Sequence, residues 1–202
     1  MSNKFFTSDH HFYHYNIIDL CKRFAIDGRN KQEANDYMTE LLIERWNSKI
    51  EETDEVYHLG DFFWCGAERA ITILDRLNGI KYWVRGNHDK VGPLEDQFVW
   101  VRDYYELKVH DNFKDSDGKI KQYHQPIVLC HFPLLSWNCM AHGAWHFHGH
   151  CHGSIDNTWN STGLRKDVGV DTNDLYPYSY EELKNFLTLR TVVPTDHHKH
   201  SG

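Results

Sequence analysis

The sequence predicts an α/β fold in which short buried strands alternate with helices. Two observations carry this prediction. Apolar runs of about five residues recur between segments with helical spacing, and clusters of Asp, Asn and His directly follow several of these runs. Strands that alternate with helices usually pair in parallel through helical crossovers. Ligand sites in such sheets lie outside the carboxyl ends of the strands, which is where the polar clusters fall.

Composition narrows the class of protein. The chain has 202 residues, 40% hydrophobic and 25% charged, as expected for one globular domain. The formal charge of −7, without a Lys/Arg run, gives no support to duplex nucleic-acid binding. We expect no membrane span and no signal peptide, and five Cys without a CxxC pair predict reduced thiols in a cytoplasmic protein. Residues 1–190 are expected to form the domain and residues 191–202 a flexible tail.

The first half of the chain reads as strand, two helices, strand, helix, strand. The expected strands are apolar runs that end in polar residues, and the expected helices repeat apolar residues every three or four positions. Asn78-Gly79 is a good end signal for the third helix. The expected elements are strands at residues 4–8, 55–59 and 80–84 and helices at about residues 16–24, 38–50 and 70–77.

The second half is richer in strands. Residues 115–118, Asp-Ser-Asp-Gly, predict a hairpin turn. Residues 92–125 are the longest segment between polar clusters, and we expect that they form a partial lid over the site. The expected elements are strands at residues 98–105, 106–109, 119–123, 127–130, 145–148 and 167–171 and a last helix at residues 180–187.

The polar clusters together resemble the ligand set of a metal site. They offer carboxylates, an amide oxygen and several imidazoles without thiolates, a set that suits first-row divalent ions such as manganese, iron, zinc or nickel. It has too many imidazoles for calcium and too many members for one tetrahedral zinc. The candidate ligands are Asp9, His11, Asp61, Asn87, His131, His150 and His152.

The same residues occur in a specific order of motifs. Asp9-x-His11, Gly60-Asp61, Gly86-Asn87-His88-Asp89, His131 and Gly149-His150-x-His152 resemble, in order, the five signature motifs of the calcineurin-like metallophosphoesterase superfamily. The likeness is greatest to its small, capless bacterial and phage members. It implies a four-layer α/β/β/α sandwich with a dinuclear metal site at the carboxyl ends of the strands. Asp9, His11 and His152 would hold one ion, Asn87, His131 and His150 the other, and Asp61 would bridge them.

The resemblance implies a dinuclear metal-dependent phosphoesterase. We expect in-line attack of a metal-bridging hydroxide on phosphorus, with two manganese ions as the first choice and iron, zinc or nickel as alternatives. His88 is expected to bind a phosphate oxygen or to protonate the leaving alkoxide. Protein phosphatases of the family carry an Asp three residues after the bridging Asp, which orients this histidine. Trp64 stands at that position here, so either Asp89 orients His88 or no residue does.

The sequence says less about the substrate. We expect small phosphodiesters such as cyclic nucleotides, with His14, Arg85 and Arg165 as candidate contacts and Trp64 as one possible surface for base stacking. The alternatives are a phosphomonoesterase, a nuclease acting on nucleic-acid ends, and a catalytically silent metal-binding scaffold. A scaffold is disfavoured because it would be expected to lack some ligands or His88. The sequence does not indicate the oligomeric state.

Overall fold

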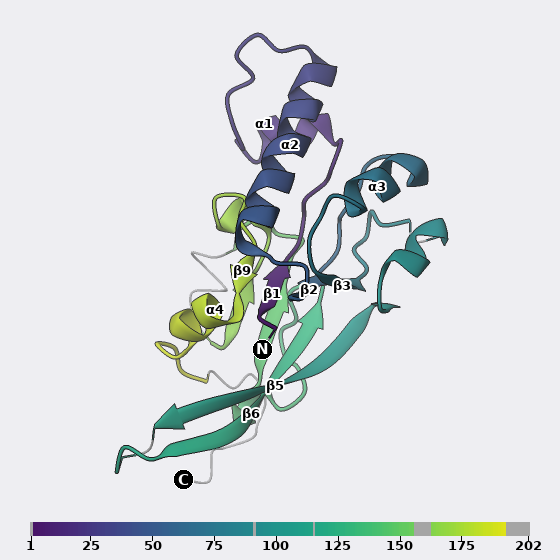
Figure 1. Cartoon of the computed structure of the whole chain (residues 1–202). Helices are drawn as coiled ribbons and strands as arrows, with labels where there is room; N and C mark the ends of the chain where they lie inside the picture. The colour runs from purple at the N-terminus through teal and green to yellow at the C-terminus, as the bar shows by residue number, and fades with distance from the viewer. Residues whose placement is uncertain (1, 91, 115, 156–162, 193–202) are drawn as a thin grey trace.

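Two β-sheets form the centre of the computed structural model, and helices flank them (Figure 1). The structure describes residues 2–90, 92–114, 116–155 and 163–192. Within these ranges one sheet has five strands in the order β4-β3-β2-β1-β9 and the other has four in the order β5-β6-β7-β8. The predicted α/β sandwich with two sheets at its centre is therefore confirmed. Most of the expected C-terminal tail lies outside the described residues, which end at Val192.

The first sheet brings the early strands together in parallel. β1 (Lys4–Thr7), β2 (Glu55–His58), β3 (Ile80–Val84) and β4 (Val101–Arg102) run in one direction, and β9 (Tyr178–Ser179) pairs antiparallel with β1. Because the parallel strands point the same way, their carboxyl ends meet at one edge of the sheet. The strand expected at residues 98–105 is mostly replaced by the two-residue β4 and the start of a strand in the second sheet.

The second sheet contains a long hairpin. β5 (Tyr104–Lys114) and β6 (Ile120–Cys130) are antiparallel, and β7 (Trp145–His148) and β8 (Arg165–Asp167) follow β6 in parallel. Two expected strands, at 119–123 and 127–130, are one continuous strand, β6. The strand expected at 167–171 is wrong in its position. The chain turns after Asp167, whose carboxylate accepts a hydrogen bond from the Gly169 N–H, and Val170–Thr172 form a 3₁₀ turn, η3.

Helices cover one face of the first sheet. α1 (Tyr15–Leu20), α2 (Lys31–Lys49) and α3 (Ala67–Leu74) lie on that side, and α4 (Tyr180–Leu187) follows β9 (Figure 1). Capping boxes begin α2 at Asn30 and α4 at Ser179, which explains why both start sharply. α1 ends at Leu20, so the expected extension to Phe24 is wrong. In the described part of the chain, no helix combines the length and apolar character needed to span a bilayer.

Successive side chains of β1 point to opposite faces of the sheet and pack into two different hydrophobic cores. Phe5 packs with the helices against one face of the first sheet, whereas Phe6 packs between the two sheets. The ring of Phe6 lies 4.8 Å from that of Phe147 on β7, in an edge-to-face arrangement. Both Phe5 and Phe6 are buried, at 5% and 0% exposure. The two sheets are therefore held at a fixed distance directly below the strand ends that carry the polar clusters.

The β5–β6 hairpin does not cover the site. Tyr104 pairs with Cys130, next to His131, whereas Lys114 pairs with Ile120 at the far end of both strands. The hairpin turn therefore lies at the end of the sheet opposite the polar clusters, and it extends away from α1, α2 and α3 (Figure 1). The prediction of a lid at 92–125 is wrong for these two strands. Its first part lies near the site, since Pro93 and Leu94 line the same cavity as His88.

Candidate metal centre

All seven candidate ligands lie on the loops that leave the carboxyl ends of β1, β2, β3, β6 and β7. Five of them have left-handed backbone angles, with φ between +48° and +70°, a conformation that few non-glycine residues adopt. Such strain collects where a structure needs a side chain in a particular direction. The five are Asp9, His11, Asp61, His150 and His152.

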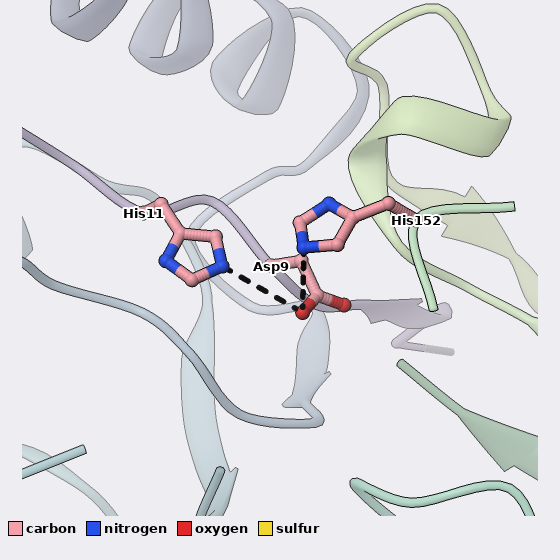
Figure 2. A group of neighbouring side chains, drawn as sticks. All are labelled: Asp9, His11 and His152. Carbon is pink, nitrogen blue, oxygen red and sulfur yellow. Dashed lines mark ion pairs between the residues drawn. The ribbon is translucent and has the colours of Figure 1, made fainter. Parts of the chain in front are cut away.

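The first group of candidate ligands surrounds Asp9 (Figure 2). Nε2 of His11 lies 3.9 Å from Oδ1 of Asp9, and Nε2 of His152 lies 3.8 Å from the same oxygen. These separations are too long for hydrogen bonds. They match two ligand atoms on either side of an ion that is about 2.0–2.2 Å from each.

The second group surrounds Asp61 and includes His131 and His150. Oδ1 of Asn87 lies 3.0 Å from Nε2 of His131 and 2.9 Å from Nδ1 of His150. Oδ2 of Asp61 lies 3.6 Å from Nε2 of His131 and also 3.6 Å from Nε2 of His11. One carboxylate oxygen therefore lies at the same distance from a histidine of each group.

The buried groups in this site fit a bound cation. Within the described residues, both ring nitrogens of His11 are buried without a hydrogen-bond partner, which is costly unless another ligand satisfies them. Burial raises the pKa of Asp9 to about 8 and lowers the pKa of His11 to about 2. A divalent ion would offset the cost of the Asp9 charge and would bind neutral His11 directly.

Two glycines allow the loops to approach each other closely. A Cβ atom on Gly86 would lie 2.2 Å from Oδ1 of Asp61, and one on Gly149 would lie 2.3 Å from Oδ2 of Asp9. Neither distance is possible without displacing the carboxylate. The glycines in the Gly-Asn-His-Asp and Gly-His-x-His motifs therefore leave room for the acidic candidate ligands.

His88 lies at the open side of the site. Its backbone N–H donates to Oδ1 of Asp61 at 2.9 Å, and its Nε2 lies 4.0 Å from Oδ2 of the same residue. The imidazole is 43% exposed. The Trp64 ring meets it edge to face, with the ring centroids 4.8 Å apart. His88 thus reaches the edge of the ligand cluster while one side of its ring stays accessible to a substrate.

The carboxylate of Asp89 contacts backbone N–H groups of the site loops. It accepts hydrogen bonds from the backbone N–H groups of Asp61, Phe62 and Gly86 at 2.7–2.9 Å, and from the Trp83 indole at 3.2 Å. These contacts tie the loop after β2 to the loop after β3. Asp89 is therefore a positioning residue for Asp61, and the expectation that it orients His88 is not supported by its contacts.

The three candidate substrate contacts differ in their surroundings. The His14 ring stacks on Trp64 at 4.2 Å, close to the site. Arg85 is partly exposed and forms an ion pair of 2.6 Å with Asp103. Arg165 is buried, at 6% exposure, and donates to the carbonyl oxygen of Leu134. The placement of Arg165 does not support a substrate contact.

Sequence reasoning missed two residues that support His152, namely Asp171 and Arg23. Nδ1 of His152 lies 2.6 Å from Oδ2 of Asp171, and Asp171 accepts two hydrogen bonds from Arg23, at 2.8 and 2.9 Å. Arg23 also donates to the backbone carbonyls of Asp9 and His10. Burial lowers the pKa of His152, but Asp171 opposes this, and the pKa is raised to about 10 overall. One sequence signal was available, because Asp171 directly follows the short apolar run Val168-Gly169-Val170, after the three-residue strand β8.

Cys21 lies next to the same pair. Its sulfur and the ligand atoms of His152 and Asp171 lie within 4.8 Å of one another. Both oxygens of Asp171 already bind Arg23. This group is therefore best described as the support of His152.

A comparison with known protein families shows to which family the chain belongs. The model of the calcineurin-like phosphoesterase family matches residues 5–188, a range that includes every candidate ligand. The chain belongs to the calcineurin-like phosphoesterase family. Members of this family are metal-dependent phosphoester hydrolases, and the arrangement of Asp, Asn and His at the strand ends agrees with that chemistry.

Relatives of the chain are similar over nearly their whole length. It is 31% identical over 201 residues to an uncharacterized protein of Methanocaldococcus jannaschii, covering 96% of this chain and 97% of that protein. It is 26% identical to the gene 66 protein of Mycobacterium phage D29, over 88% of this chain and 92% of the relative. A crystal structure of a protein of unknown function from Aquifex aeolicus matches with a TM-score of 0.61 and 23% identity, over 92% of this chain and 100% of that one. That last likeness supports the fold.

Proposed function

We propose that this protein is a dinuclear phosphodiesterase that hydrolyses small phosphodiesters such as cyclic nucleotides. The observation that carries the proposal is the position of Asp61, whose Oδ2 lies 3.6 Å from a histidine of each ligand group. Asp9, His11 and His152 would hold one ion, Asn87, His131 and His150 the other, and Asp61 would contact both. Manganese is the first choice because the ligands mix oxygen and imidazole nitrogen. A cytoplasmic location stays a prediction.

The metal ions and the protein contribute different parts of the reaction. When bound, two divalent ions supply Lewis acidity at the phosphoryl oxygens and acidify the attacking water. His88 contributes a proton. The oxygen of water forms a bond to phosphorus, the bond from phosphorus to the departing oxygen breaks, and that oxygen takes the proton of His88. The proton that the water loses returns the histidine to its starting state by way of solvent.

The charges near the site favour a diester over a monoester. A monoester carries about two negative charges at neutral pH, and enzymes often bind the second one with an additional cation. Arg23, the buried arginine nearest to Asp9, is fully engaged with Asp171 and with backbone carbonyls. Arg85 is paired with Asp103. Arg23 is therefore not available for the extra charge, and Arg85 would first have to leave its partner Asp103. The assembly of all seven expected ligands and His88 argues against a scaffold.

The proposal is tested on protein that has been stripped of metal and reloaded with manganese. The measurements are bound metal per chain and the turnover of bis(p-nitrophenyl) phosphate and p-nitrophenyl phosphate. We expect two ions per chain and a preference for the diester. Asp61→Asn should lose at least one ion and most of the turnover. Asp174→Asn, a change at an exposed residue that is paired with Arg45, serves as the matched control.

Each other outcome has a definite meaning. A preference for the monoester would replace the proposal with a phosphomonoesterase. Two bound ions without turnover of either ester would favour the scaffold. Full diester turnover in Asp61→Asn would show that this carboxylate does not bridge the ions.

A further inference from the structure

A cavity of about 670 Å³ opens beside His88. It lies between the loop that follows β2 and the segment that leads from β3 into the 3₁₀ turn η1 (Gly92–Gln97). Its volume falls within the range of small-molecule sites. Asn87 and His88 are among its lining residues, so the cavity borders the candidate metal centre.

Apolar and aromatic residues form most of the lining of this cavity, and its polar lining residues are Asn87, His88, Asp89 and Lys90. Phe63, Trp83 and Leu94 line it and are buried, at 8%, 1% and 3% exposure. Trp64 also lines it and is 46% exposed. A half-exposed indole beside the candidate site offers a flat aromatic surface on which a ligand can stack. The cavity therefore combines a rigid apolar base with an accessible aromatic wall.

Two histidines hold Trp64 in one orientation. The His14 ring stacks on the indole at 4.2 Å with the ring planes 17° apart, and the His88 ring meets it at 4.8 Å with the planes 60° apart. An aromatic surface that is already ordered binds a flat ligand without a further entropic cost of fixing its side chain. Trp64 is thus suited to stack on a planar group next to the reacting phosphate.

The position of His88 decides which part of the substrate reaches the cavity. In the proposed reaction His88 gives its proton to the departing oxygen, so the departing group lies on the side of His88. That side opens onto Trp64 and the apolar walls. An apolar, planar leaving group would fill the cavity while its oxygen remained beside the histidine.

We propose that this cavity binds the leaving group of the substrate as a nucleoside, with its base stacked on Trp64. The inference rests on the proposed phosphodiester hydrolysis and adds a substrate class to it. Stacking of a base on an aromatic side chain strengthens binding by about 5- to 140-fold. Nucleoside phosphodiesters would therefore be preferred over diesters of the same reactivity that have no base.

A competing aromatic surface exists on the other side of the ligand cluster. Phe132 is 44% exposed, and its ring lies 5.0 Å from His131 and 4.9 Å from His150. A base that stacked there would lie beside the second ligand group and away from His88. Phe132 is therefore the matched control for Trp64, since both are exposed aromatic residues next to candidate ligands.

The test compares two cyclic esters that share a five-membered phosphate ring: adenosine 2′,3′-cyclic phosphate, which carries a ribose and a base, and glycerol 1,2-cyclic phosphate, which carries neither. The ratio of kcat/KM for these two esters is measured with manganese-loaded wild type, Trp64→Ala, Trp64→Phe and Phe132→Ala. We expect a ratio above about 5 in the wild type. The ratio should fall toward 1 in Trp64→Ala, be largely kept in Trp64→Phe and stay at the wild-type level in Phe132→Ala. Thermal unfolding confirms that each variant is folded.

A second measurement does not depend on turnover. Calorimetry compares the affinities of adenosine 3′-monophosphate and glycerol phosphate, and Trp64→Ala should lose the preference for the nucleotide. A wild-type ratio near 1, an unchanged ratio in Trp64→Ala, or loss of the ratio in Phe132→Ala would overturn the inference. Failure of the proposed function looks different, because then neither ester is hydrolysed although both ions are bound. The calorimetric preference still tests the cavity in that case.

Discussion

Oδ2 of Asp171 lies 2.6 Å from Nδ1 of His152, and this contact leaves Nε2 of the same ring facing Asp9. A carboxylate on one ring nitrogen fixes the tautomer and the orientation in which the other nitrogen binds a metal ion. Arg23 in turn holds Asp171 from a segment 148 residues earlier. The position of one candidate ligand therefore depends on two residues outside every motif.

Replacing Asp171 should weaken metal binding without removing a ligand. We expect Asp171→Asn to lower manganese affinity by about 10- to 100-fold, because the ring of His152 loses its charged partner. Asp171→Glu should recover part of the affinity. Competition with a metal chelator measures the change, and Asp174→Asn is the control. Equal affinity in Asp171→Asn and wild type would mean that Asp171 does not support the ligand.

His88→Gln should separate catalysis from metal binding. Removing a proton donor that lies beside the ligands, with its Nε2 4.0 Å from Asp61, is expected to lower kcat for the diester by about 10²- to 10⁴-fold. The protein should still bind two manganese ions. His142→Gln, at an exposed histidine of the 3₁₀ turn η2 (Met140–His142), is the control. Full turnover in His88→Gln would rule out a catalytic role for this residue.

Asp89→Asn should destabilise the site loops. Its carboxylate accepts hydrogen bonds from the N–H groups of Asp61, Phe62 and Gly86, and an amide cannot accept all of them. We expect a loss of about 1–3 kcal/mol in unfolding free energy, which corresponds to a fall in Tm of about 2–12 °C for a chain of this size. Calorimetric unfolding measures it. A large loss of kcat with an unchanged Tm would instead indicate that Asp89 orients His88.

Gly86→Ala should disturb the position of Asp61. The added Cβ atom would lie 2.2 Å from Oδ1 and 2.5 Å from the backbone nitrogen of Asp61. The backbone atom cannot move aside as a flexible side chain would. We expect fewer than two bound manganese ions per chain. Gly66→Ala is the matched control, because its Cβ atom would meet nothing within 4 Å and its φ is −68°. Two ions in Gly86→Ala would show that the loops can separate.

Asp111, which lies far from the site, should make the stability of the protein depend on pH. It accepts hydrogen bonds from Lys184 and Tyr180 of α4. Burial alone would raise the pKa of Asp111, but these two partners lower it below its usual value overall. The contribution of Asp111 to stability is therefore present above the unfolded pKa of about 4 and is lost as the pH falls through the lower, folded pKa.

The matching measurement is urea unfolding of wild type and Asp111→Asn at several pH values. The variant should be less stable by about 1 kcal/mol at pH 7. The difference should shrink as the pH falls from 5 to 3. A difference that stays constant over this range would mean that the charge of Asp111 does not contribute.

Local patterns in the sequence determined where the strands that precede the candidate ligands end and which residues follow them. The run at 80–84 became β3 without change, and the helix expected at 180–187 became α4 with the same bounds. Both depend on interactions within a few residues: apolar spacing in one case and the Ser179–Glu182 capping box in the other. The order of the motifs was enough to assign the family, which the match over residues 5–188 confirmed.

Tertiary structure decided what supports these residues. Asp171 lies beside His152 and Arg23 beside Asp171 because turns bring three distant segments together, and no spacing along the chain encodes those contacts. The role of Asp89 depends on which N–H groups face its carboxylate across two loops. The cavity beside Trp64 is lined by residues from the segments after β2 and β3, which the parallel pairing of these strands brings together. The motif residues could be recognised in the sequence because they lie directly at strand ends. Their partners could not, because only packing in three dimensions brings those residues next to them.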